Sequence, residues 1–201
     1  LGYVYVDTGA MYRAVAYFAM QHNLVSETHL DATELVAQLP NINLRFQFNP
    51  GLGFAEMYLN NENIETQIRT IEVSRMVSKV AEISEVRAKL VEQQQAMGKD
   101  KGIVMDGRDI GTVVFPDAEL KLFMTASSKT RAQRRFDELV EKGQHITFDE
   151  VLQNVEERDY IDTHREDSPL VKANDAIEID NSSLSKKEQF ELVLNLVKEK
   201  L

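Results

Sequence analysis

The segment GIVMDGRD, residues 102–109, gives the clearest indication of the fold of this chain. Its first half is an almost unbroken apolar run, as expected of a strand buried on both faces of a parallel sheet. Its second half places Asp106, Arg108 and Asp109 directly after that strand. These charges would be costly to desolvate without partners, and ligands of open parallel sheets bind beyond the carboxyl ends of the strands. The segment therefore predicts a binding site at a strand end.

Three further apolar runs, at residues 3–6, 120–124 and 176–179, also end in polar turns. Helical patterns lie between and after them, and strands that alternate with helices predict a parallel sheet covered on both faces. Hydroxyl, carboxylate and guanidinium groups would then gather along one rim, which suits a charged, hydroxylated small molecule. The groups are Asp7, Thr8 and Arg13 after the first run, and residues 125–128 and 180–182 after the other two.

The segment from about residue 38 to residue 97 has a different pattern. Alternating apolar and polar residues predict a strand with one solvated face, and the turn Asn49-Pro50-Gly51 separates it from a second strand. We therefore expect a small α+β insertion that contains an antiparallel hairpin. Its predicted elements are strands over 42–48 and 54–59, a turn at 60–63, and helices around 72–81 and 84–97.

Capping residues indicate where helices begin and end. Asp7 is either the cap of a helix whose pattern starts near Met11 or a site residue, and the sequence leaves both readings open. Ser128 is the expected cap of a helix that ends at Gly143. Two pairs have capping-box spacing, Thr147 with Glu150 and Ser185 with Glu188. The last helix also has an apolar stripe that we expect to pack in the core, formed by Phe190, Val193, Leu194 and Val197.

Composition excludes several classes of protein. The 201 residues include no Cys, so disulfides, thiolate catalysis and Cys-based metal sites are excluded. The net charge of -10 argues against broad binding to nucleic acid or to anionic membranes. No apolar run approaches the roughly 20 residues of a membrane-spanning helix, and no basic leader is visible. We expect a cytoplasmic, monomeric protein with no nucleic-acid or membrane partner.

Two helical segments place arginines in register. Arg131, Arg134 and Arg135 share one helix face, and Arg158, Asp162 and Arg165 share another. Like charges so close together repel unless an anion or a carboxylate neutralises them, and Arg suits bidentate contact with phosphate. The alternative is a solvated face with acidic partners. The candidate partners are Glu138, Glu157 and Asp159.

Three motifs together resemble the bacterial cytidylate kinases. They are DTGAMYR at residues 7–13, DGRDIGTVVFP at residues 106–116, and Glu157-Arg158-Asp159 with Asp162 and Arg165. The resemblance covers essentially the whole chain, and the second motif is its most specific part. It implies an α/β fold with a three-layer parallel sheet of the P-loop nucleoside monophosphate kinase type. The implied division is a core of residues 1–37 and 98–201, with a lid at about 128–145, and a monophosphate-binding insertion at 38–97.

The resemblance also implies roles for individual residues. Thr8, Arg13 and Asp109 would bind the monophosphate, with Asp109 on the ribose hydroxyls, and Arg108 would be a second phosphate contact. Ser78, Arg87 and Arg165 would lie near the cytosine, and Arg158, with Asp162, near the sugar or phosphate. Asp106 would be the carboxylate near Mg²⁺. The lid arginines, Arg131, Arg134 and Arg135, would fold over the phosphoryl group that ATP transfers.

The implied activity is transfer of the γ-phosphoryl group of ATP to CMP or dCMP in pyrimidine nucleotide metabolism. Such a kinase needs a Gly-rich loop ending in Gly-Lys-Ser/Thr, and these 201 residues contain none; Gly98-Lys99 is followed by Asp100. In the family, this P-loop and the first strand lie just upstream of the position that matches Leu1. We expect that they belong to the natural protein, and that the 201 residues alone are inactive.

Three other readings stay open. The chain could be a CMP-binding module without catalysis, or a kinase for another nucleoside monophosphate. It could also be a structural α/β domain whose arginine clusters are only solvated. The preference between ribose and deoxyribose and the tolerance of UMP are not fixed by the sequence.

Overall fold

The computed structural model describes residues 2–200 and divides into two compact units. The first contains the described residues up to Ile110 together with Arg165–Pro169. The second contains Gly111–His164 and the described residues from Leu170 onward. The fold is mixed α/β, as the alternation of patterns predicts, but within residues 2–200 the parallel strands form two separate pairs and not the one expected sheet.

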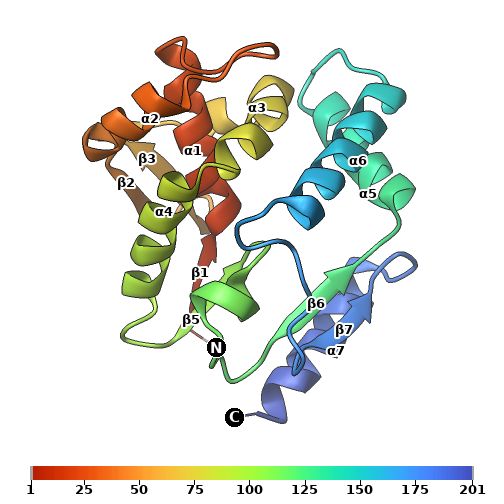
Figure 1. Ribbon diagram of the computed structural model, residues 1–201. Coiled ribbons are helices and arrows are strands. Elements are labelled where there is room, and N and C mark those ends of the chain that lie inside the picture. The colour runs from red at the N-terminus through yellow and green to blue at the C-terminus, as the bar shows by residue number, and fades with distance from the viewer. Residues whose placement is uncertain (1, 201) are drawn as a thin grey trace. The chain divides into compact units, whose positions relative to one another are not determined.

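The first unit is built around a parallel strand pair and one buried helix. Strand β1 (Val4–Asp7) pairs in parallel with β5 (Ile103–Asp106), and the register sets Asp7 opposite Asp106. Helix α1 (Thr8–Gln21) begins directly at the end of β1 and runs among the other helices of the unit (Figure 1). Its apolar residues are largely inaccessible to solvent, and Met11 and Val15 lie in the core.

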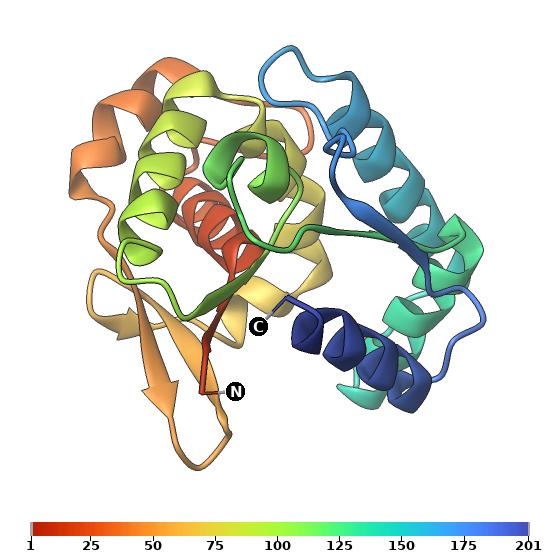
Figure 2. The same cartoon turned by 90° about the horizontal axis from the view of Figure 1, so that it is seen from below.

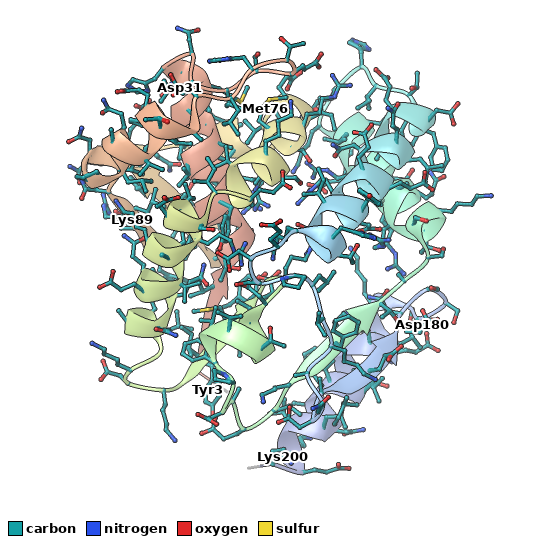
Figure 3. The ribbon with its side chains drawn as sticks, viewed as in Figure 1. Tyr3, Asp31, Met76, Lys89, Asp180 and Lys200 are labelled. Atoms are coloured by element: carbon teal, nitrogen blue, oxygen red, sulfur yellow. The ribbon has the colours of Figure 1, made fainter. Side chains whose placement is uncertain are left out.

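The remaining elements of this unit surround α1. They are α2 (Ala32–Gln38), the 3-10 turns η1 (Leu39–Asn41) and η2 (Gln67–Arg69), α3 (Ile71–Ala81), α4 (Ser84–Met97), and the antiparallel strands β2 (Leu44–Asn49), β3 (Phe54–Leu59) and β4 (Glu62–Asn63). Figure 2 shows the β2–β3 hairpin extending away from these helices. Lys89 of α4 (Figure 3) donates to the carbonyl of Ile42 at 2.8 Å and also to that of Leu39, which ties η1 to α4.

The second unit contains another parallel pair and three helices. Strand β6 (Leu122–Thr125) pairs with β7 (Ile177–Asp180), and the helices are α5 (Ser128–Glu141), α6 (Phe148–His164) and α7 (Lys186–Lys198). A π-helical turn, η3 (Ile110–Val114), spans the boundary between the units in sequence. Within the described residues, no helix has the length and hydrophobicity that spanning a membrane would require.

Most local predictions are confirmed. The hairpin strands and the helices α3 and α4 lie where the alternating and helical patterns place them, although the expected turn at 60–63 also contains β4. Asp7 caps α1, Gly143 follows the end of α5 with a φ of 76°, and the two capping boxes form. The cap of α5 is Ser127, not Ser128, because the Ser127 hydroxyl accepts the Thr130 N–H.

Two predictions of burial are wrong. Val104 of β5 is 50% exposed, so this strand is not covered on both faces within residues 2–200, where its one neighbour is β1. Phe190 is 65% exposed, and no residue of α7 is fully buried, so the apolar stripe of this helix is only partly packed. In both cases the apolar pattern sets the element type, while burial depends on which neighbours cover it.

Candidate active site

The ends of β1 and β5 bring two of the predicted motifs together. The Thr8 hydroxyl donates to the main-chain carbonyl of Asp106 at 2.6 Å, and Thr8 is only 2% exposed. Gly107 permits this approach, because a Cβ at that position would lie 2.4 Å from Thr8 Oγ1. The first turn of α1 and the charged turn after β5 therefore form one structure.

Asp7 holds two arginines at this strand end. Its Oδ2 accepts from Arg13 Nη2 and from Arg69 Nη1, each at 2.7 Å, while Oδ1 accepts the Ala10 N–H at 3.0 Å. Burial alone would raise the pKa of Asp7, but the guanidinium groups of Arg13 and Arg69 outweigh it and hold that pKa below its ordinary value. Arg69 also pairs with Glu65 at 2.6 Å, which fixes its direction. The result is two positive groups at the start of α1.

Asp106 has a different environment from Asp7. Desolvation and the nearby Asp7 carboxylate raise its pKa above the ordinary value. Its Oδ1 accepts the Tyr5 hydroxyl at 3.0 Å. Arg108 follows on an exposed turn and lowers the pKa of Asp106 less than burial raises it. A cation bound beside Asp106 would therefore stabilise the charged form of this carboxylate.

A buried ion pair joins helix α4 to the turn that follows β5. Arg87 of α4 pairs with Asp109 through Nη2, and the two side chains are only 3% and 5% exposed. Arg87 Nη1 also donates to the carbonyl of Ala81 at 3.2 Å, and the guanidinium carbon lies 5.5 Å from the ring centre of Tyr12. Burial raises the pKa of Tyr12 to about 12, and the Tyr12 hydroxyl has no hydrogen-bond partner among residues 2–200.

Two more predicted residues are buried in the first unit. Ser78 of α3 is 4% exposed and Arg165 is 7% exposed. Arg165 donates from Nε and Nη2 to the carbonyl of Ser168, at 2.9 and 2.7 Å. Charges on Arg87 and Arg165 both lower the pKa of the nearby Asp167, after a larger effect of its hydrogen bond with Ser168. The first unit thus contains eight of the predicted site residues: Thr8, Arg13, Ser78, Arg87, Asp106, Arg108, Asp109 and Arg165.

The other predicted residues belong to the second unit. Arg131 of α5 makes a bidentate pair with Asp159 of α6, at 2.8 and 2.5 Å, and donates from Nε to the carbonyl of Ala126 at 3.0 Å. Arg135 pairs with Glu138 at 2.7 Å, and Arg134 donates to the side chain and carbonyl of Asn181. In α6, Arg158 is half-buried and Asp162 is buried. Asp159 and Glu138, two of the acidic partners that the sequence offers, thus pair with Arg131 and Arg135.

Sequence reasoning missed Arg69, Tyr5 and Tyr12 as site candidates. Arg69 lies in a short 3-10 turn of the insertion, far in sequence from Asp7, and no local pattern signals their contact. Tyr12 stands inside the DTGAMYR motif, where its helical pattern suggests only core packing. Within the described residues, no group of three or more His, Cys, Asp or Glu side chains is arranged to hold a metal ion.

Comparison with known proteins identifies the family of this chain. The model of the cytidylate kinase family matches residues 1–199. The chain belongs to the cytidylate kinase family.

Close relatives in the cytidylate kinase family share most of the sequence. A cytidylate kinase of Flavobacterium johnsoniae is 71% identical over 197 residues, covering 98% of this chain and 86% of that protein. One of Flavobacterium psychrophilum is 68% identical, covering 98% and 87% respectively. One of Bacteroides thetaiotaomicron is 53% identical over 191 residues, covering 95% of this chain and 83% of that protein.

Proposed function

We propose that this chain is a cytidylate kinase that transfers the γ-phosphoryl group of ATP to CMP or dCMP, which gives CDP or dCDP and ADP. The observation that supports this most strongly is the pair of guanidinium groups held by Asp7 at the end of β1. Arg13 and Arg69 approach the same carboxylate oxygen, and Arg69 also pairs with Glu65, so a phosphate brought to this position meets two guanidinium groups held in fixed directions. Family membership and the similarity to named cytidylate kinases support the choice of substrate.

The monophosphate nucleotide would bind in the first unit. Arg13, Arg69 and Arg108 would neutralise its phosphate beside the first turn of α1, whose N-terminus also favours an anion. Thr8 would fix the main chain there. The buried polar set, which is Ser78, Arg87, Asp109 and Arg165, with Tyr12, would bind the sugar and base. A wrong base would leave some of these buried groups without a hydrogen bond, which is a strong basis for discrimination.

The transfer step needs no side-chain nucleophile. A phosphate oxygen of CMP attacks the γ-phosphorus of ATP, a new P–O bond forms, and the bond to the β–γ bridging oxygen breaks as ADP leaves. Catalysis of such a step comes from positioning and from neutralisation of charge. Arg131, Arg134 and Arg135, as lid residues, and Arg158 with Asp162 would supply charge and position. A closed lid would exclude the water that otherwise hydrolyses ATP.

Asp106 fits a role in holding Mg²⁺. The ion prefers oxygen ligands and is usually bound by one or two carboxylates together with substrate phosphates, so a cluster of three protein ligands is not required. Desolvation and the neighbouring Asp7 carboxylate raise the pKa of Asp106 more than Arg108 and Arg13 lower it, so a bound cation would stabilise the charged carboxylate. When bound, Mg²⁺ would neutralise charge on the ATP phosphates.

The proposed fold is that of a P-loop kinase in three layers, with residues 38–97 as the insertion over the monophosphate. The 201 residues contain no Gly-Lys-Ser/Thr loop, so we propose that the ATP phosphates are bound by sequence outside them. The length of the relatives is compatible with this, because the chain covers 86–87% of the two Flavobacterium proteins. Cytoplasmic location and a monomeric state remain predictions.

A coupled assay of ADP release tests the proposal on the natural full-length protein. We expect turnover with CMP and dCMP to exceed that with AMP or GMP. Arg69→Met should reduce kcat/KM for CMP by about 100-fold, because it removes a charged phosphate contact. Equal turnover of all four monophosphates would contradict the proposed specificity.

The alternative that the sequence left open, a CMP-binding module without catalysis, gains no support from the relatives, which are named as kinases. Calorimetric titration of the natural protein distinguishes the two. Binding of both CMP and Mg-ATP supports the kinase, whereas binding of CMP alone supports the module.

A further inference from the structure

Tyr5 contacts the candidate metal carboxylate from the neighbouring strand. Its hydroxyl donates to Asp106 Oδ1 at 3.0 Å. In the parallel register, Tyr5 lies opposite Val104 and Asp7 lies opposite Asp106, so these side chains point to one face of the strand pair. The hydrogen bond therefore runs diagonally, from the middle of β1 to the last residue of β5.

The two strand-end carboxylates are held in different ways. Asp7 accepts from Ala10, Arg13 and Arg69, so the protein itself occupies both of its oxygens. Within residues 2–200, the Tyr5 hydroxyl is the one hydrogen-bond donor to the Asp106 carboxylate. It engages Oδ1 and leaves Oδ2 to other ligands. A single neutral donor fixes the direction of a carboxylate without cancelling its charge.

The hydroxyl is the part of Tyr5 that needs an explanation. Within residues 2–200 the ring is 54% exposed, and the specific contact that the side chain makes there is through its hydroxyl. Phe and Tyr both suit a strand, and they differ here only in the hydroxyl group. In the described residues, the hydrogen bond that this hydroxyl makes is the one to Asp106.

We propose that Tyr5 is a positioning residue for phosphoryl transfer, which holds Asp106 Oδ1 so that Oδ2 is directed at the divalent cation. This inference rests on the proposed role of Asp106 in holding Mg²⁺. Groups that orient a metal ligand commonly affect metal affinity when removed, by about 10-fold or more. Tyr5 does not touch the substrate in this scheme, and it acts only through Asp106.

The test uses Mn²⁺ as a spectroscopic probe in the natural full-length kinase with CMP and ADP bound. Electron paramagnetic resonance measures free Mn²⁺, and binding to ADP alone is subtracted. We expect Tyr5→Phe to weaken Mn²⁺ binding by about 10-fold and to raise the Mg²⁺ concentration needed for half-maximal activity, with kcat restored at high Mg²⁺.

Tyr3→Phe is the matched control, because it removes a hydroxyl just before β1 (Figure 3) from a side chain that is also exposed, at 44%. Within the described part of the chain, the Tyr3 hydroxyl has no hydrogen bond, so this variant should bind Mn²⁺ as the wild type does. A loss of Mn²⁺ affinity in Tyr3→Phe equal to that in Tyr5→Phe would overturn the proposal.

Asp106→Asn distinguishes a failure of the positioning role of Tyr5 from a failure of the proposed role of Asp106 in holding Mg²⁺. If Asp106→Asn weakens Mn²⁺ binding and Tyr5→Phe does not, the positioning role is overturned and the role of Asp106 stands. If Asp106→Asn leaves Mn²⁺ binding unchanged, both fail. In the double variant, the effect of Tyr5→Phe should disappear, and a fully additive effect would show that Tyr5 does not act through Asp106.

Discussion

The Asp7 carboxylate has two structural tasks at once. One oxygen caps α1 through the Ala10 N–H, and the other holds Arg13 and Arg69. Asn is also a good helix cap, so Asp7→Asn keeps the first task and weakens the second. We expect this variant to lose about 1–3 kcal/mol of unfolding free energy at pH 7, as when hydrogen bonds to a charged group are removed.

The pH dependence of this loss follows from the lowered pKa of Asp7. An acid whose pKa is lower in the folded state stabilises the protein above its unfolded pKa, near 3.8, and this stability is lost as the pH falls through the folded pKa. The difference between wild type and Asp7→Asn should therefore shrink below about pH 4 in urea unfolding. Asp31→Asn is the control, because Asp31 caps α2 through Glu34 N–H in the same way. A constant difference at all pH values would contradict the assignment.

The buried Arg87–Asp109 pair gives a prediction of larger size. Arg87→Met leaves the Asp109 carboxylate buried without its guanidinium partner, and breaking a buried pair in this way costs about 3–5 kcal/mol. Arg75→Met is the matched control, since the Arg75–Glu27 pair is 3.5 Å long and exposed, and such pairs contribute at most about 1 kcal/mol. Urea unfolding measures both, and equal losses would show that burial of the pair does not matter.

At the scale of residues, the sequence best predicts those site residues that follow a strand closely in the chain. Asp106, Thr8 and Arg13 follow apolar runs, and the rule for parallel sheets places such residues at one edge. Arg69 has no such signal, because packing of the insertion against α1, and not sequence proximity, places it beside Asp7. Tyr5 is one residue of the apolar strand run, and that pattern gives no indication of its contact with Asp106.

At the scale of elements, the turn after β5 depends on a glycine. Gly107→Ala would place Cβ 2.4 Å from Thr8 Oγ1 and 2.9 Å from Ile110 Cδ1. We expect the Thr8 hydrogen bond to Asp106 to break, with a loss of about 1–3 kcal/mol from overpacking and with weaker CMP binding in calorimetric titration.

Gly51→Ala is the control for that change. Its Cβ would lie 3.3 Å from Asn49 Oδ1 in the hairpin turn, so a small side-chain movement accommodates it. This variant should bind CMP as the wild type does and lose less than about 1 kcal/mol of stability. If Gly107→Ala behaves in the same way, the close contact of the two motifs is not needed for the site.

Element types are more predictable than element surroundings in this chain. Periodicity and caps locate α3, α4 and the hairpin because these signals are local. The exposure of Val104 and Phe190 is not local, because it depends on which parts of the chain cover β5 and α7. The cap of α5 shifts by one residue because Ser127 and Ser128 are adjacent, equally suitable caps, and only backbone conformation distinguishes them.

At the scale of the whole molecule, the two units contain different parts of the proposed reaction. The residues proposed for the monophosphate nucleotide, except Arg158 and Asp162, belong to the first unit, and the proposed lid arginines belong to the second. A ligand stabilises the state that binds it by an amount set by its concentration relative to Kd, about 2.7 kcal/mol at 100 times Kd. Amide hydrogen exchange reports local opening along the chain, so the effect of a nucleotide can be read in each unit.

We expect the 201-residue chain to be stabilised by CMP and not by Mg-ATP. The groups proposed for CMP lie largely in the first unit, whereas a Gly-Lys-Ser/Thr loop does not occur in these residues. Hydrogen exchange should show that CMP slows exchange around residues 7–13 and 84–90, and that ATP has no such effect in either unit. Arg69→Met, as the control, should weaken the CMP effect. Protection by Mg-ATP equal to that by CMP would mean that these 201 residues contain an ATP site which the sequence does not reveal.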